Sequence, residues 1–147
     1  MSIDPAVAFE ILLVEDDPAD AGLAKRALKN GKMLCHVHHV RDGVEALDFL
    51  HRRGEANAAA PRPDLILLDL NMPRMDGRHV LQEMKKDPEL CSIPVVVLTT
   101  SDVDRDVAAS YMLGANSFVT KPMDMENFFE AIRTIETYWF NVVKLPK

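Results

Sequence analysis

This chain of 147 residues is poor in cysteine and holds no long apolar run. Its two cysteines, Cys35 and Cys91, stand at unrelated spacings that form neither a disulfide framework nor a zinc pattern, which favours thiols in a reducing compartment. No stretch approaches the roughly 20 apolar residues of a membrane span, and residues 1–8 lack the basic start and apolar core of a signal peptide. We therefore expect a cytoplasmic protein with no membrane partner.

Positive charge is also scarce, because 17 Lys and Arg stand against 23 Asp and Glu and leave a formal net charge of -6. Phosphate backbones attract proteins with a surplus of Lys and Arg, and no basic stripe is present, so we expect no nucleic-acid partner. No internal repeat or second domain is visible. With 48% hydrophobic residues, the chain has enough apolar side chains to build the core of one globular domain without metals or disulfides.

The apolar residues gather in short runs, which favour the buried strands of a parallel sheet. The run at 65–68 has four consecutive aliphatic residues, too few for a helix, and turn signals bound it on both sides. Similar runs at 10–14, 94–98 and 117–119 predict further strands, and 35–40 is interpreted as a short second strand. Helical patterns occupy about 17–30, 44–53, 77–87, 102–113 and 124–138, with Asp17 as the expected cap of the first helix and a surface loop at 54–63. This alternation predicts an α/β fold, a doubly wound five-stranded parallel sheet with five helices.

Polar residues stand where four of these predicted strands end. Glu15 and Asp16 follow the first strand, Asp69 the third and Thr99 the fourth, while Lys121 comes just after the fifth. Because the carboxyl ends of parallel strands open on one edge of a sheet, these side chains converge if their strands are adjacent. Like charges about 4 Å apart repel by about 4 kcal/mol at an effective dielectric near 20, a cost that a divalent cation offsets. An all-oxygen set of ligands suits magnesium better than zinc.

Magnesium beside a carboxylate, a hydroxyl and an ammonium group is the combination that phosphoryl transfer to an aspartate requires. Asp69 is the candidate nucleophile, Thr99 would donate a hydrogen bond, and Lys121 would offset charge on the phosphoryl oxygens. The product would be an aspartyl phosphate. An acidic surface edge with one lysine salt bridge would explain any one of these residues, but their shared position at strand ends favours a functional site.

Four short motifs give the chain its resemblance to a known family. They are Val-Glu-Asp at 14–16, Leu-Asp-Leu-Asn-Met-Pro at 68–73 with Asp-Gly at 76–77, Leu-Thr at 98–99, and Gly-Ala at 114–115 leading to Lys-Pro at 121–122. With these motifs the chain resembles the receiver domain of two-component response regulators, over about residues 9–138. The resemblance implies a flavodoxin-like, CheY-like receiver fold and a phosphoprotein that carries an aspartyl phosphate.

The resemblance also implies a role for each matching residue around the acidic edge. Asp69 would be the phosphoacceptor, and Asp16 and Asp69 would be direct magnesium ligands. Glu15 would act on the metal largely through water, and the backbone carbonyl of Asn71 would be a further ligand.

Two more residues at the strand ends would contact the phosphoryl group, and one of them would also signal its presence. The family pattern gives Thr99 and Lys121 these contacts. It also gives Thr99 a movement toward the phosphate, after which the aromatic side chain at Phe118 would fill the vacated space. Phe118 lacks the hydroxyl of the tyrosine often found there, so packing would drive its movement, and a plain core role for Phe118 is the alternative.

The last residues, 139–147, are more apolar than a solvated terminus should be. They either fold back on the last helix or pack against a second copy in an isologous homodimer. The residues expected at such a dimer contact are Trp139, Phe140, Val142, Val143 and Leu145. We therefore expect an N-terminal segment at 1–8, a receiver domain at 9–138 and a C-terminal extension at 139–147 that serves as a dimerisation element.

The C-terminal extension, with Glu-Asp-Asp-Pro-Ala-Asp at 15–20 and Leu-Thr-Thr-Ser at 98–101, resembles the single-domain response regulators of bacterial and cyanobacterial phytochromes. The resemblance implies a phosphoryl group accepted on Asp69 from a sensor histidine kinase, with a bacteriophytochrome as the leading candidate. The output would be phosphorylation-dependent binding of another protein. The chain would not be an enzyme, apart from self-catalysed phosphoryl transfer and autodephosphorylation.

Two other functions stay open from the sequence. A chain with the same fold can be a phosphorelay shuttle or a phosphate sink. A protein of another class, a magnesium-dependent phosphatase of the haloacid-dehalogenase type, would also use Asp69 as its nucleophile. That class needs a second aspartate two residues further on, where this chain has Asn71, and a cap domain over the substrate, which is not visible here.

A cluster of possible soft-metal ligands precedes the second helix. Cys35, His36, His38 and His39 lie close together in the sequence, but strand alternation sends neighbours to opposite faces and the spacing fits no common zinc pattern. We interpret the histidines as exposed or edge-strand residues.

Overall fold

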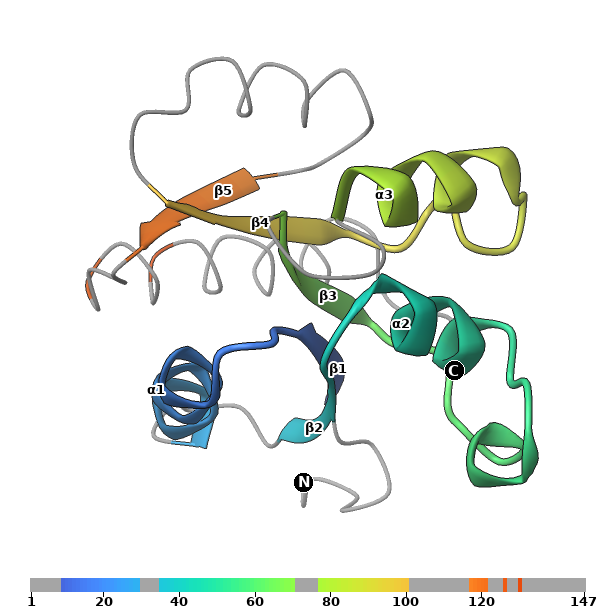
Figure 1. Cartoon of the computed structure of the whole chain (residues 1–147), viewed down its shortest axis with the longest axis horizontal. Helices are drawn as coiled ribbons and strands as arrows, with labels where there is room; N and C mark the ends of the chain where they lie inside the picture. The colour runs from blue at the N-terminus through green and yellow to red at the C-terminus, as the bar shows by residue number, and fades with distance from the viewer. Residues whose placement is uncertain are drawn as a thin grey trace, which may run out of the picture.

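A computed structural model gives the fold, and it describes residues 9–29, 35–70, 77–100 and 117–121 together with Glu126 and Glu130; at 99–100 and 117–121 it describes the backbone alone. These residues form a five-stranded parallel sheet with strand order β2-β1-β3-β4-β5 (Figure 1). The strands are β1 (Phe9–Val14), β2 (Cys35–Val40), β3 (Leu65–Asp69), β4 (Val95–Thr100) and β5 (Ser117–Lys121). The parallel sheet predicted from the apolar runs is confirmed.

Helices cover both faces of the sheet. Helix α1 (Pro18–Lys29) packs on one face, while α2 (Gly43–Leu50) and α3 (Gly77–Lys86) pack on the other (Figure 1). This arrangement confirms the doubly wound topology. The predicted helix at 102–113 and nearly all of the one at 124–138 lie outside the described residues. No helix in the described ranges combines the length and the hydropathy needed to cross a bilayer.

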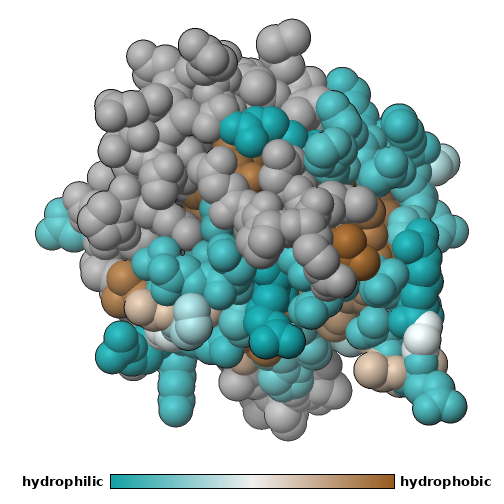
Figure 2. Space-filling view, viewed as in Figure 1, coloured by the Kyte–Doolittle hydropathy of each residue, from teal (hydrophilic) through white to brown (hydrophobic). Residues whose placement is uncertain are grey.

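Strand β3 shows why the apolar runs are continuous rather than alternating. All five of its residues are buried, because its two faces pack against different helices. Leu65 and Leu67 belong to the hydrophobic cluster under α1, and Ile66 and Leu68 belong to the cluster under α2 and α3. Burying one such side chain stabilises the fold by about 1.5–3 kcal/mol. Outside these clusters, the described part of the face in Figure 2 is mostly hydrophilic, with small hydrophobic areas between the polar ones.

Helix α1 begins where its sequence predicts. The Asp17 carboxylate accepts hydrogen bonds from the backbone N–H groups of Ala19 at 2.8 Å and Asp20 at 3.3 Å, so the predicted cap is confirmed. The face toward the sheet is built mainly from small side chains: Ala21, Ala24, Ala27 and Leu28 are buried. Small side chains let the helix lie close to the strands that carry the acidic residues.

Helix α2 is shorter than the predicted 44–53 because its ends are set by contacts that the apolar pattern does not show. At its start, the Asp42 carboxylate accepts a hydrogen bond from the Glu45 N–H at 2.9 Å. After its end, Arg52 has a positive φ of 56°, and its side-chain Nε donates to the Ala60 carbonyl at 2.8 Å. A left-handed residue stops a helix, so the predicted end at 53 was wrong. The expected surface loop that follows contains a short 3-10 helix, η1 (Glu55–Asn57).

Candidate functional site

The carboxyl ends of four neighbouring strands form one edge of the sheet, and the predicted site residues lie along it. Val14 at the end of β1 pairs with Leu68 in β3, so Glu15 and Asp69 are the next residues on two adjacent strands. The sequence predicted that Asp69 follows the third strand. In the structure it is the last residue of β3. The strand order also places β4 beside β3 and β5 beside β4, which is the adjacency that convergence of the site requires.

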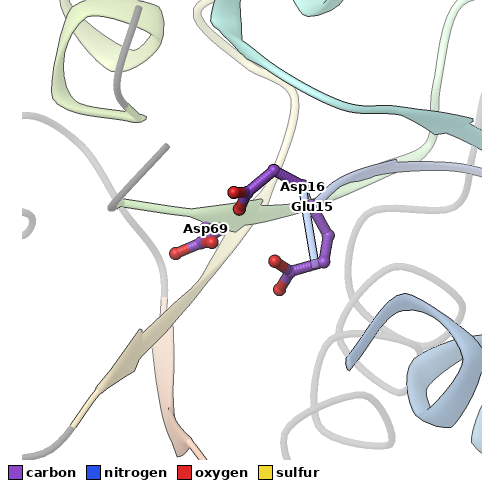
Figure 3. A group of neighbouring side chains, drawn as sticks. All are labelled: Glu15, Asp16 and Asp69. Atoms are coloured by element: carbon purple, nitrogen blue, oxygen red, sulfur yellow. The ribbon is translucent and has the colours of Figure 1, made fainter. Parts of the chain in front are cut away.

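Three carboxylates meet at this edge. Glu15, Asp16 and Asp69 each offer one oxygen, and these three oxygens lie within 4.8 Å of one another. Figure 3 shows the side chains of Glu15 and Asp16 extending from the end of β1 toward the side on which Asp69 lies. Glu15 is 0% exposed and Asp69 3%, whereas Asp16 is open to solvent. Two of the three acids are therefore buried, and the third, Asp16, lies on the solvent side of the group.

The acidic cluster, Glu15, Asp16 and Asp69, has the donor chemistry of a magnesium site. At an effective dielectric near 20, charges at such separations repel by roughly 3–4 kcal/mol per pair, less where solvent reaches Asp16. A bound divalent cation offsets that repulsion. The donors are oxygens only, which suits a hard cation such as magnesium and gives zinc none of the nitrogen or sulfur ligands that it favours. The residues present therefore fit the metal that the sequence implies.

Backbone and side-chain hydrogen bonds fix Glu15 in this position. Its N–H donates to the carbonyl of Val40 at 3.0 Å, and its carboxylate accepts from the N–H of Asp17 at 3.0 Å. Its carbonyl lies 2.7 Å from Nε2 of His39, a distance at which the imidazole N–H donates to the oxygen. The end of β2 and the start of α1 thus both hold the residue that precedes Asp16.

Gly77 brings the start of α3 against the end of β3. Its N–H donates to the Leu70 carbonyl at 3.1 Å. A Cβ at this position would lie 2.5 Å from the Asp69 carbonyl oxygen and 2.9 Å from the Leu70 Cα, distances that real side chains do not reach. The sequence marked Gly77 as a turn signal and as part of the Asp-Gly motif, but the close approach of two backbones is what requires glycine here.

The hydroxyl and the lysine expected at the site lie on the same edge. Strands β4 and β5 run two residues further than predicted, and their pairing aligns Thr99 with Thr120 and Thr100 with Lys121. Asp69 pairs with Leu98, so the backbone of Thr99 is one position further along the neighbouring strand. Sheet register therefore brings the backbones of these residues to the edge that carries the acidic cluster.

Other predicted residues are described in part or not at all. Phe118 pairs with Val97 through the backbone of β5. Asn71 and the C-terminal extension, with Trp139, Phe140, Val142, Val143 and Leu145, lie outside the described residues.

The histidines of β2 divide between the two faces of this edge strand. His36 Nδ1 and His38 Nε2 lie 3.0 Å and 2.7 Å from the two carboxylate oxygens of Glu10, while His39 reaches Glu15 instead. Burial alone would raise the pKa of Glu10, but the hydrogen bonds and charges of His38 and His36 outweigh it and lower that pKa. Sequence reasoning missed the link from His39 to Glu15, because its only signal was a histidine near the end of a predicted strand.

The fold and the site together give a parallel sheet wound on both faces with buried carboxylates at its carboxyl edge. Residues 11–133 match the family model described as the response regulator receiver domain, and the chain belongs to that family. It is a signalling protein whose output depends on phosphorylation, and it is related to the response regulators of phytochromes.

Three relatives carry that relationship. Response regulator Rcp1 from Synechocystis is 47% identical over 136 residues, which is 92% of each chain. The phosphorylated cyanobacterial phytochrome response regulator RcpA has a solved structure with a TM-score of 0.81 and 46% identity, over 96% of this chain and 100% of that one. The bacteriophytochrome response regulator RtBRR gives a TM-score of 0.81 at 42% identity, over 96% of this chain and 85% of that one. Rcp1 has also been solved in a Mn2+-bound form, which gives a TM-score of 0.79 at 46% identity, over 95% of this chain and 99% of that one.

Proposed function

We propose that Asp69 accepts a phosphoryl group from a sensor histidine kinase. The observation that carries the proposal is the burial of Asp69 beside Glu15 and Asp16, with one oxygen from each within 4.8 Å of the others. In the transfer, an oxygen of Asp69 bonds to phosphorus as the bond from phosphorus to the donor imidazole nitrogen breaks. The charge left on the imidazole is taken up by a proton from solvent.

The acidic cluster is proposed to hold magnesium, with Asp16 and Asp69 as direct ligands, Glu15 acting largely through water and the Asn71 carbonyl as a further ligand. When bound, magnesium supplies positive charge against the phosphoryl oxygens. The all-oxygen donor set and the Mn2+-bound form of Rcp1 support this assignment. Thr99 and Lys121 are proposed to contact the phosphoryl group, which their register at the same edge supports.

The proposed input is a phytochrome that acts as the histidine kinase. Support comes from relatives that are themselves phytochrome or bacteriophytochrome response regulators at 42–46% identity. We propose that the chain works in the cytoplasm, where such a kinase domain would reach it, and that neither nucleic acid nor a membrane is its partner. The net charge of -6 and the absence of a basic stripe support the exclusion of nucleic acid.

The proposed output is a change of binding surface. Thr99 would move toward the phosphoryl group and Phe118 would fill the space that it leaves. The receiver domain would span 9–138 after an N-terminal segment at 1–8, and the apolar extension at 139–147 would pair two copies in a homodimer. No catalytic turnover is proposed beyond self-catalysed phosphoryl transfer and autodephosphorylation.

One experiment tests the acceptor and the oligomeric state together. Wild type and Asp69→Asn are incubated with acetyl phosphate, with and without magnesium, and are then examined by intact mass and sedimentation. We expect the mass of one phosphoryl group on wild type with magnesium, none on Asp69→Asn, and sedimentation as a dimer. Equal labelling of both proteins would contradict the acceptor assignment, and monomeric sedimentation would contradict the homodimer. In a separate assay, steady release of phosphate from phosphomonoesters would instead indicate a phosphatase.

A further inference from the structure

The side chain of His39 reaches from the edge strand β2 to the segment that carries two of the three acids. Its Nε2 lies 2.7 Å from the backbone carbonyl oxygen of Glu15, a residue 24 positions earlier in the chain. At this distance the imidazole N–H donates a hydrogen bond to the carbonyl. The contact is partly buried, so water competes with it less than at an exposed site.

This contact bears on Asp16 because of peptide geometry. The carbonyl of Glu15 belongs to the planar unit that also contains the nitrogen and the Cα of Asp16. The Val40 carbonyl accepts from the Glu15 N–H at 3.0 Å, so the end of β2 holds Glu15 from both sides. The orientation of the plane between Glu15 and Asp16 is thereby fixed, and with it the N–Cα bond of Asp16, so that rotation about this one bond (φ) sets the direction in which the side chain leaves the backbone.

Asp16 needs such support more than its two companions do. Asp69 is held within β3, and the Glu15 carboxylate accepts from the Asp17 N–H, whereas Asp16 is exposed and follows the end of β1. In the metal-free protein the neighbouring carboxylates repel it. We propose that His39 is a positioning residue, which holds the peptide of Asp16 so that the acidic cluster is already arranged for a divalent cation. This inference rests on the proposed metal site and adds to it a residue outside the ligand set.

Neighbouring His38 provides a matched control. It lies on the same strand, is also partly buried and also makes a 2.7 Å hydrogen bond through Nε2, but its partner is the Glu10 carboxylate at the start of β1. Replacing His38 removes its hydrogen bond to Glu10 and its ring contact with Phe49 of α2, whereas replacing His39 removes the hydrogen bond to the residue that follows β1. Only the contact of His39 leads to the acidic cluster.

The test uses the full chain and three variants. His39→Leu removes the donor, His39→Gln keeps a side-chain N–H of similar reach, and His38→Leu is the control. Magnesium affinity is measured by titration calorimetry and checked with Mn2+ by electron paramagnetic resonance. Amide hydrogen exchange at Asp16 is followed in the metal-free proteins, and urea unfolding reports stability.

We expect His39→Leu to weaken magnesium binding by about 3- to 10-fold, as loss of one hydrogen bond predicts, and to speed exchange at Asp16. His39→Gln should recover most of the affinity. His38→Leu should lose stability but keep the affinity of wild type. If His39→Leu bound magnesium as tightly as wild type, or if His38→Leu weakened magnesium binding equally, the role of His39 would be overturned and the proposed metal site would stand. Failure of wild type itself to bind either metal would overturn the proposed site, and the inference with it.

Discussion

Glu10 shows how one residue can make the stability of this domain depend on pH. Its carboxylate accepts from His36 and His38, and these contacts lower its pKa below the ordinary value of 4.5 despite partial burial. The unfolded chain therefore takes up this proton more readily than the folded one. The contribution of Glu10 to stability is fully present above about pH 4.5 and is lost as the pH falls through the lower, folded-state pKa.

The prediction for Glu10 is tested with Glu10→Gln, which removes the charge but keeps the shape. We expect the variant to be about 1 kcal/mol less stable than wild type at neutral pH. The difference should shrink as the solution is acidified below the ordinary pKa of 4.5. Urea unfolding at a series of pH values measures it, with Glu55→Gln, an exposed glutamate of η1, as the control. A difference that grows on acidification would contradict the assigned direction.

At the scale of elements, the contact between α3 and β3 gives a sharp prediction. A Cβ on Gly77 would meet backbone atoms of Asp69 and Leu70 at 2.5 and 2.9 Å, and backbone cannot rotate away as a side chain can. We expect Gly77→Ala to destabilise the fold by about 1–3 kcal/mol and to weaken magnesium binding, because the helix must push the end of β3 aside.

Gly22 in α1 provides the comparison for that prediction. Nothing lies within 4 Å of a Cβ built there, so Gly22→Ala should gain up to about 1 kcal/mol from helix propensity and leave metal binding unchanged. Unfolding curves and magnesium titrations of the two variants distinguish a local clash from a general effect of losing glycine. If Gly77→Ala and Gly22→Ala had equal stability and equal magnesium affinity, the close approach of the two backbones at Gly77 would not be what requires glycine there.

The elements also show how far the sequence predicts this structure. Strands β1, β3 and β4 were predictable from their apolar runs, because a strand with two covered faces needs no partner to be recognised, whereas the edge strand β2 carries three histidines and a weaker signal. The end of α2 was not, since it depends on the positive φ of Arg52 and on the Ala60 carbonyl that holds its side chain. The site was predictable in its carboxylates, which stand at strand ends, but not in His39 or Gly77. Their roles come from contacts with residues remote in the chain or from space that only the fold defines.

For the molecule as a whole, the acidic cluster couples folding to metal binding. A ligand that binds only the folded state raises the free energy of unfolding, by about 2.7 kcal/mol at 100 times its dissociation constant. We expect magnesium to stabilise wild type in this way, and Asp16→Asn to lose most of that effect. Without metal, Asp16→Asn should be more stable than wild type because one repelling charge is gone from the cluster.

The measurement for this prediction is urea unfolding of both proteins in chelator and in excess magnesium. Glu55→Gln removes a negative charge far from the cluster in sequence and serves as the control, which should keep the full magnesium effect. If Asp16→Asn gains as much stability from magnesium as wild type does, Asp16 is not a ligand. If it is less stable than wild type in chelator, the Asp16 carboxylate stabilises the metal-free protein by more than the other two acids repel it.

The strand order has a consequence for the newly made protein. The carboxylates after β1 leave the ribosome about 100 residues before β5, which at roughly 5–20 residues per second is a delay of about 5 to 20 seconds. Until β5 emerges, β4 has an unpaired side, and the edge that carries the acids lacks its final neighbour. A growing polypeptide thus displays two of its acids early, yet acquires the last strand of its sheet only about 100 residues later.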